Sequence, residues 1–293
     1  MEERLEGVVL KGVGGNYDVA CGDEILRCRA GGKVRRETGL LACGDRVSVK
    51  RSGKEGYILE RHPRRNGLIR PAIANIDQLV ILASQAPPVT DPYLIDKVTV
   101  IALYQGIDPV IVLNKSDLDA SESLFRAYTR AGFPVVRASA VTGEGIDELR
   151  TLLKGKISAF TGNSAIGKSS LLNRLDGRFS LRVGEMSEKI GRGRHTTRHV
   201  ELLRLENGGF VADTPGFSTF DAVQMERLTA DTLQHYFPEI DRFFGQCRFS
   251  DCRHGKEPGC AVRKAVERGD IAVTRYESYR ALLEEAAKQK LWD

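Results

Sequence analysis

The sequence predicts a multi-domain protein with an N-terminal β-barrel, a central α/β domain and a C-terminal, mostly α-helical domain. Short alternating strands with Gly-Gly turns fill the first part. Near-continuous apolar strands alternate with helices from about residue 72, and a polar helical segment begins near residue 226. We therefore predict domain boundaries at 1–65, 66–225 and 226–293.

The N-terminal domain contains five short segments in which apolar and polar residues alternate. These are EGVVLKG at 6–12, NYDVAC at 16–21, EILRCRA at 24–30, DRVSVK at 45–50 and GYILER at 56–61. Five strands in so short a stretch are typical of a small barrel, and an OB-fold is the leading candidate. OB barrels commonly bind oligonucleotides, although a purely structural barrel would show the same pattern.

Positive charge is concentrated in and just after this domain. Residues 27–70 contain 13 Lys and Arg but only four acids, although the whole chain carries a net charge of only +5. A basic segment of this kind indicates a polyanionic partner, because counterion release from RNA or DNA phosphates favours binding. A solvated surface with a chance surplus of cations is the alternative.

The central domain alternates buried strands with helices. Strands are predicted for DQLVILAS at 77–84, PVIVLNK at 109–115, PVVRAS at 134–139 and KISAFTG at 156–162. Helices are expected after Asp91-Pro92, near 119–131 and around 145–154. Buried strands joined by helices indicate a parallel sheet covered on both faces.

A G-x-x-x-x-G-K-S sequence between a predicted strand and a predicted helix is a candidate phosphate-binding loop. Its backbone N–H groups and the helix N-terminus would form an anion cradle. We expect Lys168 to reach the β and γ phosphate oxygens and the Ser169 hydroxyl to coordinate Mg²⁺. The predicted contacts are Gly162, Asn163, Ser164, Ala165, Ile166, Gly167, Lys168, Ser169 and Ser170.

The N-K-x-D motif at the end of the second predicted strand indicates selectivity for guanine. The Asp117 carboxylate can accept hydrogen bonds from the adjacent N1–H and N2–H₂ groups of guanine, and adenine offers no such pair. Loss of a charged hydrogen bond costs roughly 2 kcal/mol or more, which favours GTP over ATP. The predicted residues are Asn114 against the phosphate loop, Lys115 along the ring face, Ser116 and Asp117, with Ser139 and Ala140 supporting the base through main-chain N–H groups.

A D-T-P-G motif predicts contacts to the metal and the terminal phosphate. Asp213 is expected to bind Mg²⁺ through water, and the Gly216 N–H to sense the γ-phosphate. The residue after Gly216 is Phe217, where many guanine-nucleotide switches carry a water-positioning glutamine. Slow intrinsic hydrolysis, or another group that orients the water, is therefore expected.

The glycine-rich segment 191–197 supplies two further candidates. Thr196 or Thr197 is expected to bind Mg²⁺ once the γ-phosphate recruits this segment, and Thr197 is the preferred choice. His195 is the candidate catalytic residue that orients the water. An exposed loop histidine or an RNA contact is the alternative for His195.

Four potential metal ligands lie within 14 residues in the pattern C-x4-C-x-H-x5-C. Three thiolates and an imidazole suit tetrahedral Zn²⁺ and fill all four positions, which predicts one structural zinc ion per chain. The ligands are Cys247, Cys252, His254 and Cys260. Because the neighbouring helical segments are short and polar, the metal is expected to provide their core. The other cysteines, Cys21, Cys28 and Cys43, are predicted to be packed side chains.

The order of the motifs is unusual, because the N-K-x-D motif precedes the phosphate loop and the D-T-P-G motif follows it. With a barrel before these motifs and a cysteine–histidine cluster after them, the whole chain resembles the circularly permuted bacterial GTPases of the ribosome small-subunit-dependent GTPase A family (RsgA, YjeQ or YloQ). One departure is Ala165, where that family usually has glycine. If this position requires a positive φ, alanine adds strain there.

The resemblance implies an OB-fold barrel, a circularly permuted P-loop GTPase domain and a zinc-binding helical domain. It implies a GTPase, acting with Mg²⁺ on GTP to give GDP, that binds the 30S ribosomal subunit late in its maturation. Such a protein would be a monomer, would contact 16S rRNA with its barrel and zinc module, and would hydrolyse GTP faster on the subunit.

Two other functions fit parts of the sequence. One is an RNA-binding module that senses guanine nucleotides without physiological turnover, and the other is a P-loop ATPase acting on RNA, against which the N-K-x-D motif argues. No apolar run approaches the roughly 18 residues of a membrane span, and the N-terminus has no apolar secretory core. The protein is therefore expected in the cytoplasm, with no membrane partner and with reduced cysteines.

Overall fold

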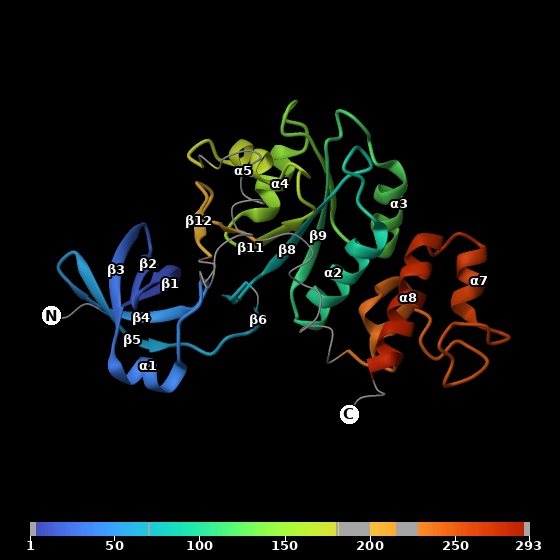
Figure 1. Ribbon diagram of the computed structural model, residues 1–293, viewed down its shortest axis with the longest axis horizontal. Coiled ribbons are helices and arrows are strands. Elements are labelled where there is room, and N and C mark those ends of the chain that lie inside the picture. The colour runs from blue at the N-terminus through green and yellow to red at the C-terminus, as the bar shows by residue number, and fades with distance from the viewer. Residues whose placement is uncertain (1–3, 70, 180, 182–199, 215–227, 290–293) are drawn as a thin grey trace.

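The computed structural model describes residues 4–69, 71–179, 181, 200–214 and 228–289. Figure 1 shows three parts side by side: a barrel, a sheet with helices on both faces, and a helical C-terminal region next to α2. The central sheet therefore stands between two smaller parts. Among the described residues, no helix combines the length and the apolar character needed to cross a membrane.

The N-terminal part is a closed five-stranded barrel, which confirms the predicted fold class. Its strands are β1 (Arg4–Val13), β2 (Asn16–Cys21), β3 (Glu24–Ala30), β4 (Arg46–Ser52) and β5 (Glu55–Arg61). They close in the order β1-β2-β3-β5-β4, with only β3 and β5 parallel, and α1 (Gly32–Thr38) leads from β3 to β4. Alternate apolar residues of the strands fill the interior, and the thiols of Cys21 and Cys28 are buried among them.

The central part contains a six-stranded sheet in the order β10-β9-β8-β11-β13-β12. Its strands are β8 (Gln78–Ala83), β9 (Asp108–Asn114), β10 (Val135–Ala138), β11 (Ile157–Gly162), β12 (Leu202–Arg204) and β13 (Phe210–Asp213). Five of them are parallel, and β12 is antiparallel at one edge. Two strands of two residues each, β6 (Gly67–Leu68) and β7 (Ile73–Ala74), pair with each other between the barrel and this sheet.

Helices cover both faces of the sheet, as a parallel sheet requires. They are α2 (Pro92–Tyr104), α3 (Glu122–Ala131), α4 (Ile146–Leu153) and α5 (Lys168–Leu175). Along β8, Leu79 and Ile81 belong to one apolar core and Val80 and Leu82 to another. Figure 1 shows α2 and α3 over the first of these faces and α4 and α5 over the second.

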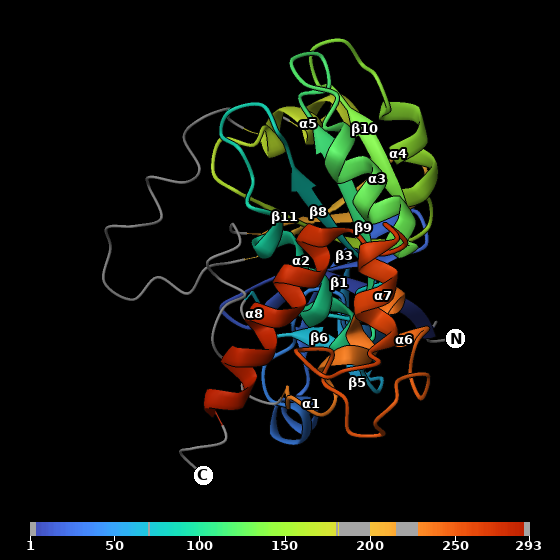
Figure 2. The same ribbon diagram turned by 90° about the vertical axis from the view of Figure 1, so that its right-hand side faces the viewer.

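The C-terminal region shares its core with the central domain. It contains η2 (Leu233–Tyr236), α6 (Pro238–Asp241), α7 (Ala261–Glu267) and α8 (Val273–Gln289). Figure 2 shows α8 alongside α2, and Leu282 of α8 belongs to the same buried cluster as Ile95 and Val98 of α2. The expectation that the metal provides the core of these helices was therefore wrong in part, because apolar packing against α2 also holds α8.

A buried ionic cluster lies at this interface. The Arg275 guanidinium is 2.6 Å from the Asp96 carboxylate and 2.7 Å from the Glu239 carboxylate, and all three side chains are at most 3% exposed. The Tyr128 hydroxyl donates to Asp96 at 2.6 Å, and the guanidinium lies over the Phe237 ring. Burial alone would lower the pKa of Arg275, but the two carboxylates outweigh it and raise that pKa, so the cation is retained.

We expect Arg275→Met to destabilise the protein by about 3–5 kcal/mol, because it leaves two buried carboxylates without a cation. Urea unfolding of the full chain measures this loss. The matched control is Arg268→Met, which removes an exposed arginine paired with Asp270 and should change stability by no more than about 0.5 kcal/mol. A loss below about 1 kcal/mol for Arg275→Met would contradict the assigned role of the cluster.

The barrel contacts the central domain through β12 and the two residues before it, among other segments. Lys11 of β1 pairs with Glu201 at 2.7 Å, and Arg204 of β12 pairs with Asp23 of the β2–β3 turn at 2.7 Å. Cys43 is buried between the two parts, where its thiol donates to the carbonyl of Val200 at 2.9 Å. Cys21, Cys28 and Cys43 are therefore all buried, packed side chains, as predicted.

Candidate functional site

The predicted nucleotide-binding residues within the described part of the chain meet at one edge of the sheet. Strands β8, β9, β10, β11 and β13 are parallel, so the loops that follow them lie at the same edge. Gly162 ends β11, Asn114 ends β9 and Asp213 ends β13. The edge formed by the carboxyl ends of these strands is therefore the candidate site.

The phosphate loop connects β11 to α5 through a tight turn that needs glycine at both ends. A Cβ atom on Gly162 would lie 2.9 Å from the carbonyl oxygen of Leu82. Gly167 has a φ of +93°, and a Cβ atom there would lie 2.6 Å from the Asn114 side-chain nitrogen. The backbone between them is thus held close to its neighbours, leaving the N-terminus of α5 to face a ligand.

Ala165 adopts a φ of 60°, the left-handed region that favours glycine. The strain that the sequence predicted for a positive φ therefore applies. For alanine this conformation costs roughly 1–2 kcal/mol relative to the right-handed region.

Lys168 and Asp213 bring two of the predicted motifs together. The Lys168 ammonium lies 2.7 Å from an oxygen of Asp213, and it also donates to the carbonyl of Thr214. Both charged side chains are less than one-fifth exposed. A cation and a carboxylate next to a helix N-terminus are the groups that phosphate oxygens and Mg²⁺ require.

Asn114 connects the phosphate loop to the base-recognition motif. Its side-chain nitrogen donates to the carbonyl of Ile166 at 2.8 Å, the link that the sequence predicted. The side chain is only 2% exposed, and its Oδ1 atom has no hydrogen-bond partner among the described residues. A buried acceptor without a partner is costly, so this atom suits a donor supplied by a nucleotide.

Hydrogen bonds fix the orientation of the Asp117 carboxylate. The Ser139 hydroxyl donates to Asp117 Oδ1 at 2.5 Å and accepts from the N–H groups of Val141 and Thr142. The main-chain N–H of Ser139 donates to the carbonyl of Glu144. The Ser139 side chain therefore holds Asp117, and the main-chain contacts expected from Ser139 and Ala140 to a base stay predictions.

Two contacts of this loop were not predicted. The Glu144 carboxylate accepts from the Ser116 hydroxyl at 2.6 Å, and the Lys115 ammonium donates to the carbonyl of Pro87 at 2.7 Å. Both contacts join segments 28 residues apart. A single sequence gives no signal for them, because nothing in either local pattern specifies the other.

Several predicted residues lie outside the described part of the chain. They are His195, Thr196, Thr197, Gly216 and Phe217. Their roles in binding Mg²⁺, sensing the γ-phosphate and orienting water stay predictions.

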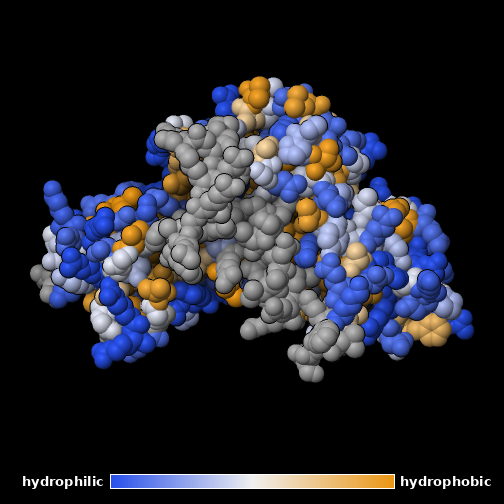
Figure 3. Space-filling model, in the orientation of Figure 1, coloured by the Kyte–Doolittle hydropathy of each residue, from blue (hydrophilic) through white to orange (hydrophobic). Residues whose placement is uncertain are grey.

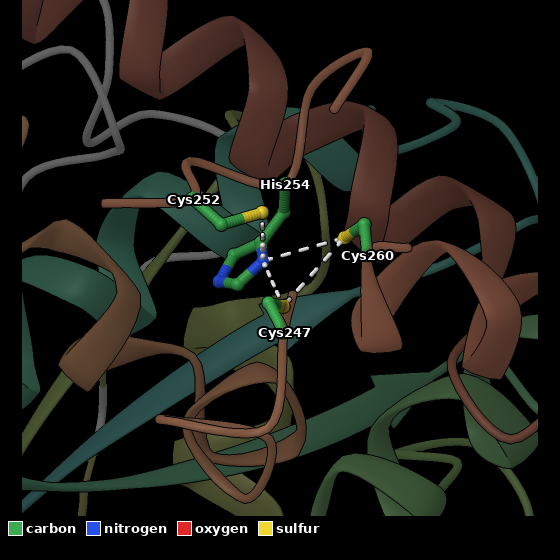
Figure 4. A group of neighbouring side chains, drawn as sticks. All are labelled: Cys247, Cys252, His254 and Cys260. Atoms are coloured by element: carbon green, nitrogen blue, oxygen red, sulfur yellow. Dashed lines mark hydrogen bonds between the residues drawn. The ribbon is translucent and has the colours of Figure 1, made fainter. Parts of the chain in front are cut away.

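The cysteine–histidine cluster forms a second candidate site, shown in Figure 4. The Nδ1 atom of His254 lies 3.6 Å, 3.7 Å and 3.5 Å from the sulfur atoms of Cys247, Cys252 and Cys260, in that order. The four ligand atoms lie within 4.8 Å of one another. Ligand atoms about 2.0–2.3 Å from a tetrahedral Zn²⁺ are separated by roughly 3.5–3.8 Å, so the donor set fits this ion.

Neighbouring groups orient the cluster for a metal ion. The Nε2 atom of His254 lies 3.0 Å from the Gln234 amide oxygen, which leaves Nδ1 to face the three sulfur atoms. Backbone N–H groups of Ala261 and Arg263 donate to the sulfur atoms of Cys247 and Cys260. Burial raises the pKa of the Cys252 thiol to about 12, so a bound cation would be needed to hold this group as a thiolate at neutral pH.

Two family profiles match this chain. Residues 61–223 match the profile described as RsgA GTPase, and residues 6–58 match the RsgA N-terminal domain.

Curated sequences and solved structures show the same likeness. Two proteins named small ribosomal subunit biogenesis GTPase RsgA are each 44% identical to this chain. For the protein from Caldanaerobacter subterraneus subsp. tengcongensis the match covers 98% of both chains. For the protein from Moorella thermoacetica it covers 96% of this chain and 97% of that one. The crystal structure of YjeQ from Thermotoga maritima is 36% identical with a TM-score of 0.81, over 97% of this chain and 99% of that one. The structure of YloQ, described as a circularly permuted GTPase, is 30% identical with a TM-score of 0.80, over 98% and 96% of the two chains.

Proposed function

The chain belongs to the RsgA family of circularly permuted GTPases, and we propose that it hydrolyses GTP while bound to the 30S ribosomal subunit late in that subunit's assembly. The observation that carries this proposal is the hydrogen bond from Asn114 to Ile166. This bond joins the N-K-x-D motif to the G-x-x-x-x-G-K-S loop, although their order in the chain is reversed, and so supports their use as one nucleotide site. Curated relatives that cover 96% or more of this chain are named for the biogenesis of the small ribosomal subunit.

In this proposal Lys168 binds the β and γ phosphate oxygens, and its ion pair with Asp213 yields to them. The Ser169 hydroxyl, Asp213 through water and the hydroxyl of Thr197 hold Mg²⁺. When bound, Mg²⁺ neutralises charge that develops on the phosphates during transfer. Asp117 pairs with the guanine edge, and the Gly216 N–H senses the γ-phosphate.

The hydrolytic water needs a group other than Phe217, because a phenylalanine side chain cannot hydrogen bond to it. We propose His195 for this role. It lies two residues before Thr197 in the same glycine-rich segment, so GTP would order the two side chains together. An acceleration on the ribosomal subunit would then reflect the placement of this segment.

Charge and metal chemistry support an RNA partner. Residues 27–70 carry 13 Lys and Arg against four acids, and this stretch includes β4 and β5 of the closed five-stranded barrel, an architecture that in OB-folds binds oligonucleotides. We propose that the barrel and the C-terminal region contact 16S rRNA and that the cysteine–histidine cluster holds one structural zinc ion. The protein would act as a monomer in the cytoplasm.

GTP turnover with and without purified 30S subunits tests the proposal. We expect at least about a tenfold acceleration by 30S subunits, equivalent to about 1.4 kcal/mol of transition-state stabilisation. Purified 50S subunits serve as the control for nonspecific RNA, and Lys168→Ala as the inactive control. Equal turnover with and without 30S subunits would instead favour a nucleotide sensor that binds RNA without physiological hydrolysis.

A further inference from the structure

The strand register of the barrel places an exposed tyrosine between two cations. Tyr57 of β5 lies opposite Arg29 of the parallel strand β3 and opposite Lys50 of the antiparallel strand β4. Opposite residues of paired strands point to the same face of the sheet and lie within side-chain reach. Asn16 of β2 continues the row on the far side of Arg29.

The row lies on the outer face of the barrel. Tyr57 is 49% exposed, whereas Tyr17 of the same barrel is 3% exposed. The residues that flank Tyr57 and Arg29 along their strands, such as Ile58 and Cys28, are buried in the barrel interior. An exposed aromatic ring beside cations is the combination that stacks a base and contacts its phosphate.

A hollow lies beside Arg29, the residue opposite Tyr57. It has a volume of about 260 Å³ and is lined by Asn16, Arg27, Arg29 and Glu55. Arg29 has no ion-pair partner among the described residues, and Arg27 lies 3.9 Å from Asp18. The hollow is smaller than the roughly 300–1,000 Å³ of a site for a drug-sized ligand, so it suits a single nucleobase or phosphate.

The same face is turned away from the rest of the molecule. The central domain contacts the barrel through β1, the β2–β3 turn and the segment before β4, by the pairs Lys11–Glu201 and Arg204–Asp23 and by the hydrogen bond from Cys43 to Val200. Figure 1 shows β3 on the side of the barrel that is farther from β12. Figure 3 shows hydrophilic surface with separate hydrophobic spots over the barrel. A long RNA can therefore reach this face while the domains stay in contact.

We propose that the outer face of β3, β5 and β4 binds one unpaired RNA nucleotide, whose base stacks on Tyr57 and whose phosphate contacts Arg29. The inference rests on the proposed function, in which RNA is the partner. It adds which surface binds the RNA and that the bound nucleotide is unpaired. The base must be unpaired, because a base inside a duplex is stacked on both sides and has no face for a tyrosine ring. Glu55 provides an acceptor for an amino group at the base edge.

The test measures binding of the full-length, zinc-loaded protein to a fluorescent oligouridine of about twelve nucleotides, within the range of site sizes of OB folds. Tyr57→Ala is expected to weaken binding roughly 5- to 150-fold, the effect of losing one stacked base. Tyr57→Phe keeps the ring and should bind like the wild type, whereas Tyr57→Leu keeps an apolar side chain and should resemble Tyr57→Ala. Thermal unfolding of each variant checks that the barrel is intact.

Salt dependence tests the phosphate contact separately. Arg29→Ala should reduce the slope of log affinity against log salt by about 0.7, the contribution of one phosphate of a single strand. Lys154→Ala removes one exposed cation from the central domain and should leave the slope unchanged. An RNA duplex of equal length should compete poorly with the oligouridine.

Three results would overturn the inference: no binding of oligouridine by the wild type, unchanged affinity of Tyr57→Ala, or equal competition by the duplex. The proposed function fails by a different measurement, since it requires 30S-stimulated GTP turnover by the wild type. Stimulated turnover together with unchanged affinity of Tyr57→Ala would therefore reject only the stacking site.

Discussion

A Cys260→Ser variant is expected to lose the zinc ion proposed for the cysteine–histidine cluster, and with it the fixed structure of the segment from Cys247 to Cys260. Cys260 contributes one of four ligand atoms, and its sulfur also accepts the N–H of Arg263 at the start of α7. Structural zinc sites in small peptides bind with apparent free energies of about 10–16 kcal/mol, and most of that energy is folding energy. Removing one thiolate should therefore lower the free energy of unfolding of this region by more than the loss of any single apolar contact.

The loss of structure should be confined to the segment from Cys247 to Cys260, because other interactions hold the rest of the C-terminal region in place. Helix α8 packs on α2 around the buried Arg275 cluster and the shared apolar core. We therefore expect guanine-nucleotide affinity to change by less than about twofold, a change below roughly 0.5 kcal/mol. Treatment of the wild type with a strong zinc chelator should give the same pattern.

Zinc content, limited proteolysis and nucleotide affinity measure these effects together. The matched control is Cys21→Ser, which changes a buried thiol of the barrel and should leave zinc content at about one ion per chain. Retention of zinc by Cys260→Ser, or unchanged resistance to proteolysis between Cys247 and Cys260, would show that the cluster is not a structural zinc site.

The strands of both β domains could be predicted because their patterns are local. Alternation along Glu24–Ala30 places every second side chain in the barrel, and the uninterrupted apolar run in Gln78–Ala83 is typical of a strand buried on both faces. The helix that begins at Pro92 was also predictable. Asp91 caps it by accepting from the Tyr93 N–H, a contact between near neighbours.

Features that depend on distant contacts could not be predicted in this way. Strand β12 has only three residues, too few to show a period. Arg275 lies in a helix whose polar sequence suggests a solvated surface, yet its side chain is 1% exposed. Its partner Asp96 is 179 residues away, so neither local pattern reveals the pair.

The site shows the same division between local and distant information. The phosphate loop and the N-K-x-D motif are compact sequence signals whose residue types follow from the chemistry of phosphate and guanine. The contacts that orient them come from other loops, as in the bonds from Ser139 to Asp117 and from Ser116 to Glu144. The sequence therefore predicts the binding groups, and the structure shows which contacts hold them in place.

Asp117→Asn is expected to exchange a preference for guanine nucleotides for a preference for xanthine nucleotides. Guanine presents an amino group at C2, which donates a hydrogen bond to a carboxylate. Xanthine presents an oxygen there, which accepts a hydrogen bond from an amide N–H. The Ser139 hydroxyl donates to Asp117 Oδ1 at 2.5 Å, so it would hold the amide oxygen of the variant and leave the amide nitrogen facing the base. The substitution thus reverses one donor–acceptor pair without changing the shape of the site.

The ratio of GDP to XDP affinity should change by about 10⁴–10⁵, because a site that hydrogen bonds one partner rejects the mismatched one by such factors. Fluorescent GDP and XDP titrations measure the ratio, and ATP turnover should remain at background for both proteins. The matched control is Asp119→Asn, an isosteric change two residues away whose side-chain oxygen still accepts from the Ser121 N–H. If Asp117→Asn kept its guanine preference, Asp117 would not read the base, and the selectivity of this GTPase would need another origin.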